Sequence, residues 1–293
     1  MEIQPSTLYI VGTPIGNLDD MTFRAVSVLQ QVTVIAAEDT RHTGKLLKHF
    51  QITTPQISYH DHNRRRRIPE LLGRMGSGES VALVTDAGMP GVSDPGYEIV
   101  KACREQGIAV VPIPGASAGI TALSASGIAT ERFVFEGFLP VKGGDRRDRL
   151  LSLATESRTI LLYESPHRLS KTLADLVTHL GSERSIVLAR ELTKLHEEFW
   201  TGTLATALSH YENHTPKGEF TLVIGGAIPT ESEWTEDRIT QELGDRIQNG
   251  TSRSHASRQL AQDTGWSRRA IYQIALTLPD PPPVVQGLQD PVP

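Results

Sequence analysis

Short apolar runs alternate with amphipathic helical stretches along most of this chain of 293 residues. Such alternation is typical of βαβ units built around a parallel sheet. The runs are rich in Val and Ile and lack a strict apolar–polar alternation, as expected for strands buried on both faces. We predict strands at Leu8–Gly12, Val32–Ala37, Gln56–His60, Val81–Asp86 and Ile108–Ile113, with helices near Met21–Gln30, Thr43–Phe50, Arg65–Met75 and Pro95–Gln106.

The second part of the chain repeats this pattern. Strands are predicted at Thr159–Glu164, Ser185–Arg190 and Phe220–Gly225. Because the first unit already has five strands, we expect two packed α/β domains, residues 1–118 and 119–228. The polar segment Pro140–Asp148 has paired glycines and paired arginines, which favours a linker or a mobile loop.

Beyond Trp234 the strand pattern stops, and three helical patterns follow, at Thr235–Gln248, Ser254–Gln262 and Ser267–Leu276. The spacing of Ala261, Gly265 and Ile271 fits a helix-turn-helix, so residues 234–278 are predicted to form a small helical module. The tail, residues 279–293, is dominated by Pro and is expected to be disordered.

The segment from Arg253 to Tyr272 contains one acidic residue, Asp263, and four arginines: Arg253, Arg258, Arg268 and Arg269. Arginine binds phosphate and guanine through a bidentate fork that is always charged. A contact with nucleic acid is therefore favoured over a purely structural helical cap.

Composition limits the class of protein. The formal net charge is −5, and Cys103 is the single cysteine, which excludes an internal disulfide and any zinc site built from several cysteines. No apolar run approaches the ~20 residues that span a membrane, and the N-terminus lacks the features of a signal peptide. We expect a cytoplasmic enzyme.

Three loops rich in Gly and Pro follow predicted strands, at Gly12–Asn17, Thr85–Gly96 and Pro112–Gly119. Glycine lets the backbone approach a ligand closely, and open α/β sheets bind ligands at the carboxyl ends of their strands. A small-molecule cleft is predicted there. Within the second loop, Asp94 is assigned as the N-cap of a helix that has Pro95 in its first turn.

A dinucleotide is the first alternative for this cleft, since the pair Glu38-Asp39 lies near the position of a ribose-binding carboxylate. The full G-x-G-x-x-G pattern is absent, however, and Pro14 removes an amide that would face a pyrophosphate. His60 and His62 lack a third ligand nearby, so no metal site is predicted.

Five ordered blocks resemble the family of 16S rRNA cytidine 2′-O-methyltransferases, in the tetrapyrrole methylase (class III S-adenosylmethionine-dependent methyltransferase) superfamily. These blocks are Leu8–Leu18, Ala36–Thr43, Asp86–Pro90, Tyr163–Arg168 and Ala189–Lys194. The resemblance implies an enzyme that transfers the methyl group of S-adenosylmethionine to the ribose 2′-hydroxyl of a cytidine in the decoding region of 16S rRNA. It also implies a cofactor cleft between the two α/β domains, and a homodimer that acts on the small ribosomal subunit or its rRNA.

Carried over by position, the resemblance implies cofactor contacts at Ile15, Gly88, Met89, Val92, Ser117, Ala118, Glu164 and Leu192. Relatives that methylate tetrapyrroles often have Asp where this chain has Met89. A contact made by the backbone at this position would tolerate the difference.

Methyl transfer to a hydroxyl needs an aligned nucleophile and benefits from a nearby base or cation. Among the polar side chains at strand ends, we predict catalytic roles for Glu191 and Lys194, with Asp39 as a further candidate. The predicted RNA contacts are Arg41, Arg64, Arg65, Arg168, Arg268 and Arg269. Two alternatives stay open, a small-molecule tetrapyrrole methylase and a ligand-sensing regulator that binds nucleic acid.

Overall fold

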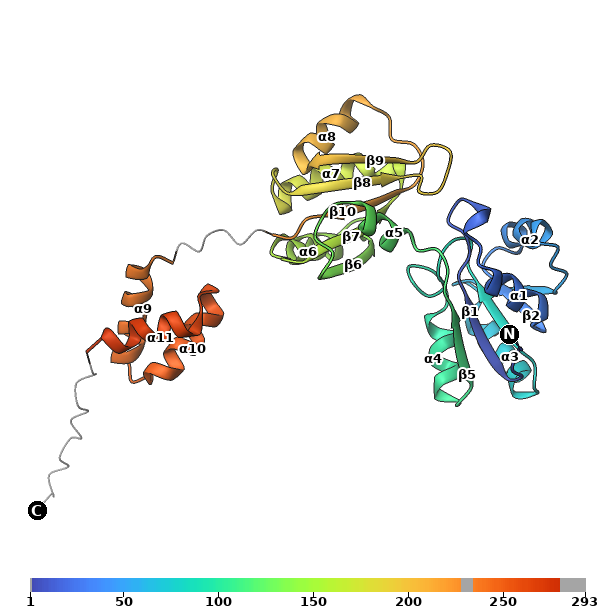
Figure 1. The fold of residues 1–293 in the computed structure, drawn as a ribbon, viewed down its shortest axis with the longest axis horizontal. Coiled ribbons are helices and arrows are strands. Elements are labelled where there is room, and N and C mark those ends of the chain that lie inside the picture. Colours follow the sequence, from blue (N-terminus) through green and yellow to red (C-terminus); the bar gives the residue numbers. More distant parts are fainter. Residues whose placement is uncertain (1, 228–233, 280–293) are drawn as a thin grey trace, which may run out of the picture. The chain divides into compact units, whose positions relative to one another are not determined.

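The computed structural model describes residues 2–227 and 234–279. The chain divides into two compact units, residues 1–227 and residues 228–293, and each is described by itself. The first unit contains two sheets and the second contains helices (Figure 1). The predicted disorder of the tail lies outside the described residues, except at residue 279.

The first sheet is fully parallel, with the strand order β3-β2-β4-β1-β5. Its strands are β1 (Thr7–Val11), β2 (Val34–Ala37), β3 (Gln56–Ser58), β4 (Val81–Val84) and β5 (Ala109–Ile113). All five predicted strands are therefore confirmed to within two residues at each end.

Helices cover both faces of this sheet, as the lack of alternation in its strands predicts. The helices are α1 (Phe23–Gln31), α2 (Thr40–His49), α3 (Arg64–Gly76) and α4 (Tyr97–Glu105), with a short 3₁₀ turn, η1 (Leu18–Asp20), before α1. The buried side chains of α1 and α2 pack on one face, and those of α3 and α4 pack on the other.

The second sheet is mixed and has the order β6-β7-β10-β8-β9. Its strands are β6 (Phe133–Phe138), β7 (Thr159–Glu164), β8 (Ser185–Arg190), β9 (Glu198–Thr203) and β10 (Phe220–Ile224). β6 runs parallel to β7, whereas β10 is antiparallel to both of its neighbours and β9 is antiparallel to β8. The three central strands were predicted, and the two edge strands were not.

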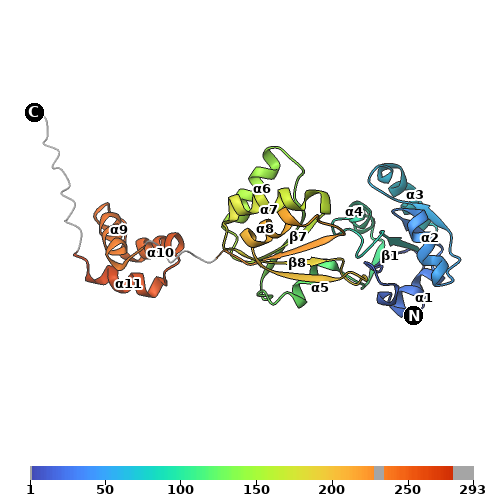
Figure 2. The ribbon, with the colours of Figure 1, turned by 90° about the horizontal axis from the view of Figure 1, so that it is seen from above.

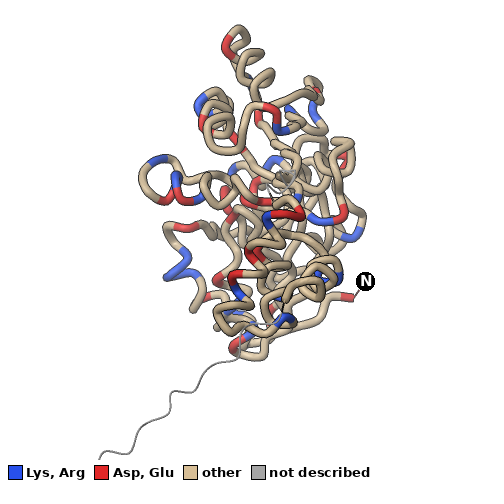
Figure 3. Tube along the Cα trace, turned by 90° about the vertical axis from the view of Figure 1, so that its left-hand side faces the viewer, with Lys and Arg blue, Asp and Glu red and all other residues tan. Residues whose placement is uncertain are grey.

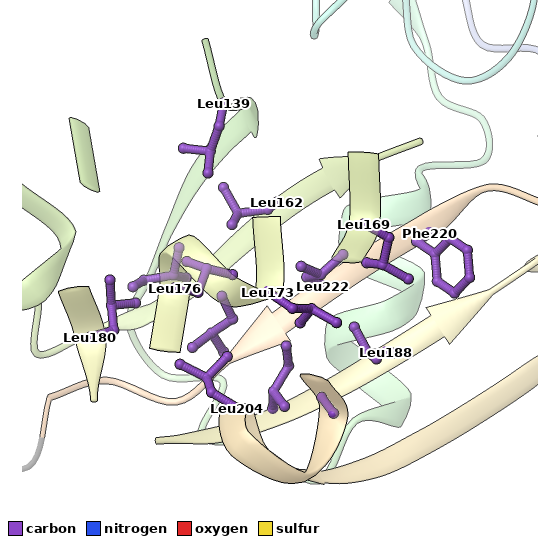
Figure 4. Close-up of a cluster of buried hydrophobic side chains, with 14 of the residues drawn as sticks. Leu139, Leu162, Leu169, Leu173, Leu176, Leu180, Leu188, Leu204, Phe220 and Leu222 are labelled. Carbon is purple, nitrogen blue, oxygen red and sulfur yellow. The ribbon is translucent and has the colours of Figure 1, made fainter. Parts of the chain in front are cut away.

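Two helical layers enclose the second sheet, and Figure 2 shows α5 on one side and α6, α7 and α8 on the other. The helices are α5 (Ala118–Ala125), α6 (Gly144–Ala154), α7 (Pro166–Leu180) and α8 (Leu204–Asn213). The layer of α7 supplies a row of buried leucines, Leu169, Leu173, Leu176 and Leu180, that meets Leu162 and Leu222 of the sheet (Figure 4). The spacing of three or four residues puts this row on one helix face.

The prediction of a linker at Pro140–Asp148 is wrong, because helix α6 begins inside it, at Gly144. Gly143 precedes the helix with φ of 86°, which glycine adopts without strain. Arg146 is 5% exposed, and its guanidinium donates to the Asp175 carboxylate and the Thr172 hydroxyl. These bonds let a normally exposed residue type anchor the helix.

The second unit contains α9 (Glu236–Gln248), α10 (Arg253–Thr264) and α11 (Arg268–Thr277) around a small apolar core. Gly265 ends α10 in the left-handed conformation, with φ of 74°, and Ile271 is fully buried. The three predicted helices are confirmed. Among the described residues, no helix has the length and apolarity needed to cross a bilayer.

Candidate active site

The three Gly/Pro loops lie together at the carboxyl ends of β1, β4 and β5. The loop after β1 joins the loop after β4 through a pair of backbone hydrogen bonds, from Thr13 N to Gly88 O (2.9 Å) and from Gly88 N to Thr13 O (3.1 Å). Gly88 has φ of 79°, a conformation that favours glycine. The two loops therefore form one connected backbone surface.

The loops after β1 and β5 touch through a pair of glycines. A Cβ atom placed on Gly12 would lie 2.7 Å from the Cα of Gly115, and one placed on Gly115 would lie 2.8 Å from the Cα of Gly12. Only glycine at both positions permits this backbone contact, which is why the sequence has glycine in each loop.

The first loop also packs against the second sheet, at the turn Glu191–Lys194 that follows β8. The amide of Asn17 donates to the Thr193 hydroxyl at 3.0 Å, and a Cβ on Gly16 would lie 2.6 Å from Cγ of Lys194. Glu191 and Thr193 have positive φ of 50° and 66°, a costly conformation for residues with side chains. The strained turn thus fixes the junction between the sheets.

A second connection between the sheets involves the start of α5. The amide of Gly119 donates to the Tyr163 hydroxyl at 3.1 Å. The ring of Tyr163 also meets Phe135 and Phe138 of β6 in edge-to-face contacts, with ring centroids 5.1 and 5.7 Å apart. An aromatic wall therefore stands beside the small residues at the start of α5.

Between these walls lies a pocket of about 660 Å³. It is lined by loops of the first sheet and by strands of the second, and its walls include all eight residues for which the sequence predicts cofactor contacts: Ile15, Gly88, Met89, Val92, Ser117, Ala118, Glu164 and Leu192. Residues from distant parts of the chain thus meet in one cavity. Whether each contacts a ligand stays a prediction.

The ionisable lining of the pocket is acidic. Its ionisable residues are Asp94, Glu164, Glu219 and Tyr163, and no Lys or Arg is among the described residues that form its walls. Glu164 is 2% exposed and accepts hydrogen bonds from the Ser165 amide and the Thr172 hydroxyl. A pocket with this charge favours a ligand that carries positive charge.

Asp94 is a site residue that the sequence did not reveal. Its assignment as a helix N-cap is wrong, because α4 starts at Tyr97 with Gly96 at the N-cap position. Asp94 instead lines the pocket. Burial, together with the negative charge of Glu38, raises the pKa of Asp94 to about 7.

The predicted catalytic residues lie outside the lining. Lys194 Nζ donates to Glu191 Oε1 at 2.9 Å and to Glu219 Oε2 at 2.8 Å, and the Glu219 amide donates to the same Glu191 oxygen. Burial raises the pKa of Glu191, but these hydrogen bonds outweigh it and the net shift is downward. The ion pair of Glu191 and Lys194 therefore holds the strained turn beside the pocket.

Asp39, the third catalytic candidate, is the N-cap of α2. Its carboxylate accepts the Arg41 amide at 2.8 Å and pairs with the Arg41 guanidinium at 2.7 Å. These bonds hold the pKa of Asp39 well below its usual range. A carboxylate with so low a pKa is a poor proton acceptor near neutral pH.

The six arginines for which RNA contacts are predicted differ in their surroundings. The Arg41 side chain is 88% exposed, and Arg65, Arg268 and Arg269 are exposed. Arg64 pairs with Asp61 and Glu98, whereas Arg168 pairs with Glu164 and donates to Leu139 O. Figure 3 shows basic positions interspersed with acidic ones along the trace.

Arg253 has a structural contact that its sequence context did not suggest. Its guanidinium donates to the carbonyl oxygens of Ala275 and Leu278 at 2.8 and 2.6 Å, so it caps the end of α11. Asp263 pairs with Arg246 from α9. The other three arginines between residues 253 and 272 are exposed: Arg258, Arg268 and Arg269.

Across residues 2–227 and 234–279, no group of three or more His, Cys, Asp or Glu side chains is arranged to hold a metal ion.

Comparison with known proteins places the chain in a family. Residues 7–208 match the model of the Tetrapyrrole (Corrin/Porphyrin) Methylases. A protein of Synechocystis sp. named ribosomal RNA small subunit methyltransferase I is 61% identical, over 92% of this chain and 98% of its own length. A protein of the same name from Halalkalibacterium halodurans is 47% identical, over 92% and 94%.

Solved structures share the fold at low sequence identity. Diphthine synthase superposes with a TM-score of 0.59 at 14% identity, covering 75% of this chain and 90% of its own. Uroporphyrin-III-C-methyltransferase from Thermus thermophilus has a TM-score of 0.53 at 21% identity, covering 74% and 94%. The chain therefore belongs to the tetrapyrrole (corrin/porphyrin) methylase family, together with the curated relatives named ribosomal RNA small subunit methyltransferase I.

Proposed function

We propose that this protein is an S-adenosylmethionine-dependent methyltransferase that methylates the ribose 2′-hydroxyl of a cytidine in the decoding region of 16S rRNA. The observation that carries the proposal is the pocket at the junction of the sheets, whose walls contain every cofactor contact implied by sequence resemblance. The relatives named ribosomal RNA small subunit methyltransferase I, at up to 61% identity, support the RNA substrate.

The pocket fits S-adenosylmethionine in size and in charge. Its volume of about 660 Å³ lies within the range of roughly 300–1,000 Å³ that small-molecule sites occupy. Ala118 and Gly119 leave room for a flat ring, and the acidic lining suits a ligand with a sulfonium charge. When bound, this cofactor supplies an electrophilic methyl group.

The residues of the chain would then bind and orient the reactants. Ile15, Met89 and Leu192 offer apolar contact and exclude water, while the connected loop backbones at Thr13 and Gly88 hold the shape of the site. Positioning of this kind supplies much of the rate enhancement of a displacement reaction.

The exposed arginines would hold the RNA by its phosphates. Arg41 and Arg65 lie on the first unit, and Arg268 and Arg269 lie on the second. Binding through phosphate contacts falls steeply with salt concentration. The homodimer and the cytoplasmic location also stay predictions, and the mass of the purified protein in solution tests the first of them.

The decisive test is methyl transfer to defined substrates. Labelled S-adenosylmethionine is incubated with the protein and with undermethylated small ribosomal subunits, free 16S rRNA or a tetrapyrrole precursor. We expect label on a cytidine ribose in the rRNA of one or both RNA substrates. Label on the tetrapyrrole alone, or on none of the substrates, would contradict the proposal.

A further inference from the structure

The position of Asp94 is fixed by the loop around it. Ser93 has positive φ of 63°, and Pro95 on the other side is buried. Ser93 also packs against the second sheet, because a Cβ on Gly137 of β6 would lie 2.5 Å from the Ser93 hydroxyl oxygen. A strained residue held between two sheets thus fixes the backbone next to Asp94, which lines the pocket.

The charge of Asp94 is not neutralised within the described part of the chain. Glu164 and Glu219, the other acids of the lining, pair with Arg168 and Lys194. Asp94 has no such cation, and the nearby Thr85 hydroxyl lowers its pKa less than burial raises it. It is the one carboxyl group of the lining that forms no ion pair among the described residues.

The groups that face Asp94 are acidic or neutral. The negative charges of Glu38 at the end of β2, Asp86 in the loop after β4 and Asp61 in the loop after β3 each raise the pKa of Asp94. Tyr163 faces it from β7, and burial raises the pKa of that phenol above its ordinary value, so it stays neutral near pH 7. A partly buried carboxylate among other acids is unfavourable until a cation arrives.

We propose that Asp94 recognises the positive charge of the methyl donor and so makes the pocket selective for a cationic ligand over a related adenosine thioether without that charge. The inference rests on the proposed function, which names S-adenosylmethionine as the ligand. That molecule carries positive charge at its sulfonium and at its amino group. S-adenosylhomocysteine keeps only the amino group, and 5′-methylthioadenosine has neither charge.

Recognition by a carboxylate couples binding to protonation. The pKa of Asp94 in the ligand-free protein is raised to about 7, so the group is largely neutral at pH 6 and largely ionised at pH 8. Only the ionised form attracts a cation. The affinity for S-adenosylmethionine therefore rises with pH through 7, while the affinity for 5′-methylthioadenosine stays level.

Calorimetric titration of the full chain tests the inference by binding alone. The dissociation constants of the three ligands are measured from pH 6 to pH 8.5 for the wild type, Asp94→Asn and Asp61→Asn. Asp61 is an exposed neighbour that pairs with Arg64 and lies outside the lining, so its variant controls for a general loss of negative charge. At pH 8 we expect Asp94→Asn to bind S-adenosylmethionine at least tenfold more weakly and without pH dependence.

The neutral analogue separates recognition of charge from damage to the fold. We expect 5′-methylthioadenosine to bind Asp94→Asn as it binds the wild type. If S-adenosylhomocysteine is also spared, Asp94 recognises the sulfonium; if it weakens equally, Asp94 recognises the amino group, and both results support the proposal. Unchanged binding of S-adenosylmethionine to Asp94→Asn, or equal weakening of all three ligands, overturns it.

The results that would contradict the proposed function differ from those that would contradict the role of Asp94. A wild-type protein that does not bind S-adenosylmethionine, or that binds it without methylating rRNA, contradicts the proposed function. A wild type that does both, with an Asp94→Asn variant that binds the donor normally, contradicts only the role of Asp94.

Discussion

The shape of the site depends on the contact between Gly12 and Gly115, because neither residue has a Cβ atom. Each glycine occupies space that a Cβ on the other would need. Apart from the Met89 sulfur beside Gly12, the nearest atoms that would clash belong to the backbone. Backbone cannot move aside as the end of a flexible side chain can. The spacing of the two loops, and with it the shape of the pocket, therefore depends on this pair.

Gly12→Ala should lower the free energy of unfolding by about 1–3 kcal/mol, because the added methyl group separates the loops after β1 and β5. Affinity for S-adenosylmethionine should fall as well. Gly73→Ala in α3 is the control, since no atom lies within 4 Å of its added Cβ, and it should be neutral or stabilising. Thermal unfolding and ligand titration measure both effects, and equal behaviour of the variants would refute the explanation.

The sequence shows that the loops are special but not how each polar residue within them is used. Ile15 and Gly88 are recognisable by their place after apolar strands, and they line the pocket. Asp94 precedes a proline, which is typical of a helix start, yet the helix begins at Tyr97. The surroundings of Asp94 depend on Glu38, which raises its pKa, and on Gly137, which packs against Ser93. Both are distant in sequence, so a local sequence pattern does not reveal them.

At the scale of elements, the turn Glu191–Lys194 connects the two sheets and carries two residues with positive φ. Its polar side chains look catalytic in the sequence. In the structure they bond to each other and to Glu219, while Leu192 between them reaches the pocket. We propose from this geometry that Lys194 positions the turn, while the catalytic role that the sequence suggests stays a prediction.

Lys194→Met distinguishes these roles. Without the two ion pairs the turn should loosen and Leu192 should shift, so we expect KM for S-adenosylmethionine to rise several-fold with kcat nearly unchanged. A group that moves a proton or stabilises charge in the transition state typically contributes about 10²–10⁴ in rate. A fall in kcat of that size with KM unchanged would restore Lys194 as a catalytic residue.

Edge elements were the ones that sequence patterns missed. The edge strand β9 has no buried residue, whereas each residue of β10 is buried, so only β10 forms an apolar run. Helix α6 was mistaken for a linker because its start contains Gly144, Arg146 and Arg147. Composition does not reveal that one of two adjacent arginines is buried.

Those two arginines supply a matched test. Arg146→Ala should destabilise the protein by about 1–3 kcal/mol, since it leaves the Thr172 hydroxyl, the Asp175 carboxylate and the Pro140 carbonyl without their donor. Arg147→Ala removes an exposed side chain and should change stability by less than about 0.5 kcal/mol. Denaturant unfolding measures both, and similar losses would show that the buried bonds contribute little.

At the scale of the whole molecule, the two compact units have separate cores. The pocket is formed within the first unit, and exposed arginines are found on both units. Cofactor binding and RNA binding should therefore be separable by truncation.

A chain that ends at Ala227 should bind S-adenosylmethionine with unchanged affinity. Its methylation of rRNA should fall by roughly tenfold or more at moderate salt, because phosphate contacts of Arg268 and Arg269 are lost. Titration and methyl transfer at two salt concentrations check this. Loss of cofactor binding in the shortened chain would instead make the helical unit part of the fold of the first.

The place of β10 in the second sheet has a consequence for protein synthesis. β10 is the last strand in the described part of the chain, yet it lies in the middle of its sheet, between β7 and β8. A nascent chain cannot complete that sheet before this segment has left the ribosome. The same holds for the pocket, because Thr221 of β10 is one of the residues that line it. The first sheet is complete by Ile113, so it can fold early during translation. Ligand binding can therefore stabilise the first unit only after its second sheet is complete.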